Sequence, residues 1–121
     1  MKEIAVGNRY ALAIYEIAKE LNRVEDMYKE LKIVMETYEL NIDFKNFINH
    51  PLVKKDDKKE FISKVFSKEV SGETMNLLHY LIDKTRLAQI KAIVTEYLKL
   101  YYERNQIVEA QATFAVEPTK E

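Results

Sequence analysis

Residues 6–21 read VGNRYALAIYEIAKEL, and their spacing predicts one helix that carries two apolar stripes. The first stripe consists of Val6, Tyr10, Ala13 and Ile17. The second stripe consists of Ala11, Ile14, Ala18 and Leu21. Together they span roughly 200° of the helix, about twice the width that an amphipathic helix presents to its own core. We therefore expect this helix to pack on two sides.

Composition restricts the class of protein. The 121 residues fit one ordinary domain, and 47% hydrophobic and 32% charged residues with two Gly and two Pro suit a helical globular chain. The net charge of −1 gives no overall attraction to nucleic acid or to an anionic membrane. The chain has no Cys, which excludes disulfides, thiolate metal sites and thiol nucleophiles.

Five further helices are expected after the first. The second covers 24–38, and the third contains Phe44, Phe47 and Ile48 and stops before Pro51. The fourth covers 56–66, with Asp56 or Asp57 as its cap and Phe61, Ile62, Val65 and Phe66 on its apolar face. The fifth covers 73–83 and again has an apolar arc of roughly 200°. The sixth covers 87–103, with Lys91, Glu96, Lys99 and Glu103 on its polar side.

The pattern changes after the sixth helix. Residues 107–116 alternate apolar and polar side chains, which predicts a strand. A single strand has no ladder partner elsewhere in the sequence, so either it pairs between molecules or the rest of its sheet is missing. The expected fold class is all-α, with a six-helix bundle over residues 1–105 and the start of a truncated second domain over 106–121.

Catalytic, cofactor and metal sites are not expected. His50 precedes a proline and His79 lies near the polar edge of the fifth helix, without a second ligand at metal-binding spacing. Two glycines cannot build nucleotide-binding loops, and no Ser-His-Asp set has a supporting spacing. The run KKDDKKE at 54–60 suits a solvated helix start. No apolar run is long enough to cross a bilayer, and the N-terminus does not resemble a signal peptide.

Four short motifs occur in an order that resembles the delta subunit of F-type ATP synthases, related to the mitochondrial oligomycin-sensitivity-conferring protein. They are RYALAIYEIA at 9–18, FINHPLV at 47–53 followed by KKEFI at 58–62, NLL at 76–78 with Arg86 and Leu87 at the start of the sixth helix, and VEAQAT at 108–113. The resemblance covers the N-terminal domain of that family and the first strand of its C-terminal domain. One departure is local: Asn105 and Gln106 replace the glycine that usually precedes the strand.

The resemblance implies a mechanical role. Members of the family are non-catalytic stator subunits that tie the catalytic head of the proton-translocating synthase to its peripheral stalk. The implied partners are the N-terminal helix of an alpha subunit and, through the C-terminal domain that we expect to be missing, subunit b. No nucleic acid and no membrane insertion are implied. The expected location is peripheral, on the cytoplasmic face of a bacterial membrane, since no organelle transit peptide is visible.

In the family, the alpha helix binds in an apolar groove between the first and fifth helices, the two whose apolar arcs are too wide here. Because the positions of Tyr10 and Ala13 resemble those that line the groove, Ala11, Ile14, Tyr15, Ala18 and Leu21 are left for the core. On the fifth helix, Met75, Leu78 and Ile82 are expected to pack inward, with Leu81 at the boundary. The expected groove residues are Val6, Tyr10, Ala13, Ile17, Leu77, Tyr80, Leu81 and Lys84.

Two alternatives stay open from the residues alone. A wide apolar helix can be buried on both sides by neighbours in a bundle. The chain could also be a small helical nucleic-acid-binding or self-associating adaptor domain. Nucleic-acid binding is disfavoured, because a recognition helix needs exposed basic and amide side chains, whereas the lysines of 56–66 are already balanced by acids.

Overall fold

The computed structural model describes residues 2–105, which form six α-helices and one short 3-10 turn. Their bounds are α1 Lys2–Glu20, α2 Val24–Leu40, α3 Ile42–Asn49, α4 Lys55–Phe66, α5 Gly72–Asp83, η1 Leu87–Gln89 and α6 Ile90–Asn105. The all-α prediction is confirmed, and the described residues contain no strand. The strand expected at 107–116, and with it the proposed second domain over 106–121, lies outside the described residues.

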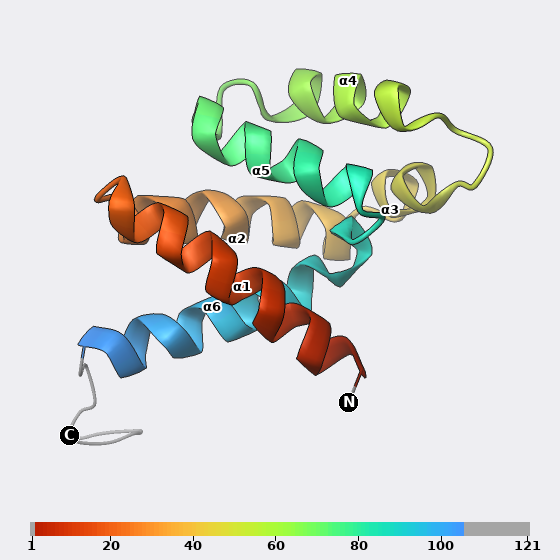
Figure 1. Ribbon diagram of the computed structural model, residues 1–121. Helices are drawn as coiled ribbons and strands as arrows, with labels where there is room; N and C mark the ends of the chain where they lie inside the picture. Colours follow the sequence, from red (N-terminus) through yellow and green to blue (C-terminus); the bar gives the residue numbers. More distant parts are fainter. Residues whose placement is uncertain (1, 106–121) are drawn as a thin grey trace.

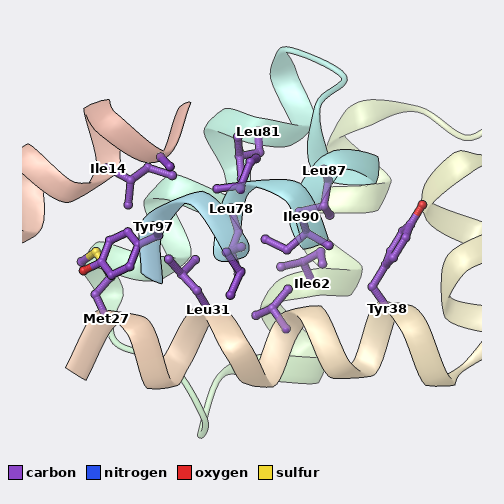
Figure 2. Packing of buried hydrophobic residues seen from close by; sticks show 14 of the residues in the cluster. Ile14, Met27, Leu31, Tyr38, Ile62, Leu78, Leu81, Leu87, Ile90 and Tyr97 are labelled. Carbon is purple, nitrogen blue, oxygen red and sulfur yellow. The ribbon is translucent and has the colours of Figure 1, made fainter. Parts of the chain in front are cut away.

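Two helical layers share one core. Helix α1 crosses α6, and both contact α2, whereas α4 lies beside α5 on another side of α2 (Figure 1). The core side chains come from every element, as Figure 2 shows for the labelled residues of α1, α2, α4, α5, η1 and α6. Tyr97 of α6 is fully buried, and its hydroxyl donates a hydrogen bond of 2.7 Å to the carbonyl oxygen of Val24. This bond fixes α6 to the first turn of α2.

The core stripe of α1 is predicted correctly except at its end. Ala11, Ile14, Tyr15 and Ala18 are buried, whereas Leu21 is 41% exposed. The reason is that α1 ends at Glu20, and the backbone turns at Asn22, which has a φ of 58°. Leu21 therefore lies in the turn rather than on the helix. On α4, Val65 is also more exposed than its apolar pattern predicts, at 38%.

Two predictions about polar residues are wrong. Lys54 is the N-cap residue of α4, and Asp56 and Asp57 lie inside its first turn, where they face the positive end of the helix dipole without capping it. Glu96 is not on the solvent side of α6 but only 8% exposed. Its carboxylate accepts hydrogen bonds from Asn8 at 3.3 Å and from Lys99 at 3.2 Å, and these contacts compensate for its burial.

Gly7 permits the close crossing of α1 over α6. A Cβ atom at this position would lie 2.8 Å from the Cβ of Ala92 and 2.9 Å from its backbone carbon and oxygen. Contacts this short with backbone atoms cannot be relieved by a side-chain rotation, so the two helices would have to move apart.

We predict that Gly7→Ala destabilises the protein by about 1–3 kcal/mol, because overpacking at the crossing exceeds the gain in helix propensity. Urea unfolding followed by circular dichroism would measure the change. The control is Gly72→Ala, because a Cβ at Gly72 meets nothing within 4 Å. Equal stability of wild type and Gly7→Ala would show that the crossing tolerates a methyl group.

Candidate helix-binding groove

One surface groove is lined by residues of α1 and α5, which run in roughly opposite directions (Figure 1). Its volume is about 520 Å³. The lining residues are Arg9, Tyr10, Ala13, Ile14 and Ile17 from α1, and Asn76, Leu77, Tyr80 and Lys84 from the region of α5. Helix α1 packs mainly against α6, and α5 packs mainly against α4. The two helices are therefore not packed mainly against each other, and the groove lies between them.

The walls of the groove are mainly apolar side chains that stay partly or well exposed. Ile17 is 41% exposed and Tyr80 is 48% exposed, while Tyr10 and Leu77 are half-buried. Ala13 is exposed between them and leaves room for another backbone to approach. Ile14, only 4% exposed, contributes to the lining from the core side. Such a surface suits an amphipathic helix that inserts its own apolar side chains.

Two tyrosines meet at one end of the groove. The ring centroids of Tyr10 and Tyr80 are 6.2 Å apart, and their planes are inclined by 58°. Each ring carries a cation: the guanidinium carbon of Arg9 lies 5.8 Å from the Tyr10 centroid, and Nζ of Lys84 lies 5.6 Å from the Tyr80 centroid. This end therefore combines aromatic surface with positive charge.

The structure brings six of the eight expected groove residues together and separates two from them. Tyr10, Ala13, Ile17, Leu77, Tyr80 and Lys84 all line the groove. Leu81, expected at the boundary, is fully buried and lies with Leu78 among the core side chains (Figure 2). Val6 is half-buried and is not among the lining residues. Three lining residues were not predicted from the sequence. Arg9 was assigned to the charged face of the helix, Ile14 to the core alone, and Asn76 to no surface.

A partly buried carboxylate holds the start of α5 against α2. Glu30 accepts hydrogen bonds from Arg23 at 2.9 Å, from the backbone N–H of Ser71 at 3.2 Å and from the hydroxyl of Thr74. Ser71 is also the N-cap of α5, and its Oγ accepts from the N–H of Thr74. Burial on its own would raise the pKa of Glu30, but the hydrogen bonds from Thr74, Arg23 and Ser71 lower it below the ordinary value.

Two lysines of α4 hold the other end of α5. Nζ of Lys59 lies 2.6 Å from the carboxylate of Asp83, and Nζ of Lys55 donates to the backbone carbonyl of Asp83 at 2.8 Å. The hydrogen bond and the charge of Lys59 lower the pKa of Asp83. Positive charge is favourable at a helix C-terminus. Two lysines from the first half of α4 therefore bind the last residue of α5, one through its side chain and one through its backbone carbonyl.

The histidines and acidic residues of the described part of the chain do not form a metal-binding cluster. Residues 2–105 contain no group of three or more His, Asp or Glu side chains placed to hold a metal ion. Nε2 of His79 lies 3.0 Å from the hydroxyl of Ser63, and Nδ1 of His50 accepts from the N–H of Leu52 at 3.1 Å. No described helix is both long enough and apolar enough to cross a membrane.

Comparison with known proteins gives the family. A sequence model of the ATP synthase delta (OSCP) subunit matches residues 6–121. The chain belongs to the ATP synthase delta (OSCP) subunit family. It is 52% identical over 120 residues to the sodium-ion-specific ATP synthase subunit delta of Ilyobacter tartaricus, a match that covers 99% of this chain and 68% of the relative.

Two further relatives carry related names. The chain is 50% identical over 121 residues to the sodium-ion-specific subunit delta of Propionigenium modestum, covering 100% of this chain and 69% of the relative. It is 44% identical over 116 residues to the subunit delta of Fusobacterium nucleatum, covering 96% and 66% respectively. The family inferred from the four motifs is thereby confirmed.

The Glu30 contacts predict how stability responds to pH. Glu30→Gln should cost about 1–3 kcal/mol at pH 7, because an amide cannot replace all the charge-assisted hydrogen bonds. Since the folded-state pKa of Glu30 is lowered, its stabilisation is present above the unfolded pKa of about 4.3 and is lost as pH falls through the folded value. The stability difference between the two proteins should therefore shrink from pH 6 to pH 3.

Chemical denaturation at a series of pH values would measure this difference. Glu36→Gln is the matched control, because Glu36 is an exposed residue of the same helix. A wild-type advantage over Glu30→Gln that stays constant down to pH 3 would contradict the assigned role of the carboxylate charge.

Proposed function

We propose that the protein is a non-catalytic stator subunit of an F-type ATP synthase, and that the groove between α1 and α5 binds the N-terminal helix of an alpha subunit. The observation that carries this proposal is the apolar groove itself, on a chain that belongs to the delta (OSCP) family. The subunit would be peripheral, on the cytoplasmic face of a bacterial membrane. The contact with subunit b implied by the resemblance is assigned to the family's C-terminal domain, and the groove has no part in it.

The dimensions of the lining support a helical occupant. Tyr10, Ala13 and Ile17 lie along one face of α1 over seven residues, which is about 10 Å of helix. A partner helix with apolar residues at i, i+3 or i+4 and i+7 presents anchors over the same length. Ala13 faces the middle of this stretch, where its short side chain lets the partner backbone come close. The tyrosines contribute large apolar rings with hydroxyl groups that can stay hydrated.

We predict that Ala13→Trp blocks binding of a synthetic peptide with the sequence of the cognate alpha N-terminus, because the indole fills the space that the partner needs. Calorimetric titration should show at least about a 100-fold loss of affinity, equivalent to about 2.7 kcal/mol. The control is Leu12→Trp, since Leu12 is exposed on the same helix but does not line the groove. Wild-type affinity in a folded Ala13→Trp protein would refute this binding site.

A milder substitution measures the contribution of the tyrosine end. Tyr10→Ala removes one ring of the Tyr10–Tyr80 pair and should weaken peptide binding by about tenfold, as expected for an aromatic residue at the edge of a binding site. Tyr102→Ala is the control, because Tyr102 is an exposed tyrosine of α6 outside the groove. Equal losses in the two variants would indicate a nonspecific effect rather than a groove contact.

A further inference from the structure

The charges of the groove are confined to one end. Arg9 and Lys84 lie against the rings of Tyr10 and Tyr80, and these rings contact each other. Ile17 lies seven residues along α1 from Tyr10, about 10 Å away, in the part of the groove that holds no cation. The groove therefore has a cationic end and an apolar end.

The described side chains, those of residues 5–104, do not neutralise these two cations. Among them, neither Arg9 nor Lys84 forms an ion pair, and no acidic side chain lines the groove. Two described acids that are next to groove residues in the sequence have other partners. Asp83, next to Lys84, binds Lys59 at 2.6 Å, and Glu16, next to Ile17, binds Arg104 at 3.0 Å.

The end of α5 does not require Lys84 for its own charge balance. The carbonyl of Asp83 already receives Nζ of Lys55 at 2.8 Å, and the Asp83 carboxylate already receives Lys59. Lys55, Lys59 and Lys84 thus lie at the C-terminal end of α5, where the negative charge comes from one carboxylate and from the end of the helix dipole. Among the described side chains, the Lys84 ammonium has one contact, the weak one with the exposed ring of Tyr80, which a carboxylate can replace.

We infer that the helix bound in this groove carries a cluster of carboxylates in the turn that lies over Tyr10 and Tyr80, and apolar anchors in the next two turns toward Ile17. This inference rests on the proposed function, because it concerns the occupant of the same groove. Docking removes water from the groove and strengthens the attraction between the carboxylates and the two cations. At the apolar end a carboxylate loses water without gaining a partner, so the charges also set the direction in which the helix lies.

The experiment uses three peptides in calorimetric titrations at low salt. The first has the sequence of the cognate alpha N-terminus, and the second has each of its Asp and Glu residues replaced by Asn and Gln. The third keeps the same apolar residues but carries the acids at the opposite end. Each peptide is titrated into wild type, into Arg9→Gln/Lys84→Gln, and into Lys29→Gln/Lys68→Gln. The last variant loses the same charge at exposed sites outside the groove.

Wild type should bind the first peptide about tenfold more tightly than the second or the third, as expected for two charge pairs that become partly desolvated. Arg9→Gln/Lys84→Gln should bind all three peptides with similar, weaker affinity, and Lys29→Gln/Lys68→Gln should behave as wild type. Equal binding of all three peptides by wild type would overturn the inference and leave the groove function standing. Failure of folded wild type to bind any of them would contradict the proposed function, and the inference with it.

Discussion

The close crossing of α1 over α6 is the contact on which the rest of the structure depends. Gly7 brings the two backbones together at Ala92, so one face of α1 can bury Ala11, Ile14, Tyr15 and Ala18 against the bundle. Helix α6 in turn holds α2 through the hydroxyl of Tyr97. With its core face satisfied in this way, α1 presents a second, partly exposed apolar face toward α5, and that face is one wall of the groove.

Much of the fold could be predicted because hydrophobic periodicity depends on local spacing. The two stripes of α1 predicted a helix with two apolar faces, and the family resemblance indicated which face is buried; the assignment failed at Leu21, where the helix has already ended, and at Val6, which does not line the groove. On α5 the same criterion was less successful. Leu81 lies at the boundary between the expected core and groove sides of that helix, and only the packing of neighbouring helices decides that it belongs to the core.

The polar contacts that position α5 could not be predicted from spacing. Glu30 and Ser71 are separated by 41 residues, and nothing in the pattern around Glu30 distinguishes it from the other acids of α2. The same is true of Lys59 and Asp83, since the run at 54–60 has the composition of an ordinary solvated helix start. Gly7 carries a weak signal in the sequence, because a glycine inside a helical pattern costs about 1 kcal/mol relative to alanine; only the structure shows the close crossing that requires it.

The two walls of the groove are anchored to different parts of the bundle. Helix α1 is fixed mainly by α6, whereas α5 is fixed by α4 and by the Glu30 contacts with α2. A helix seated between them would act as a brace that joins two separately supported units. Its binding free energy would then be added to the work needed to pull those units apart, so the bundle would resist a sideways load better when occupied than when empty.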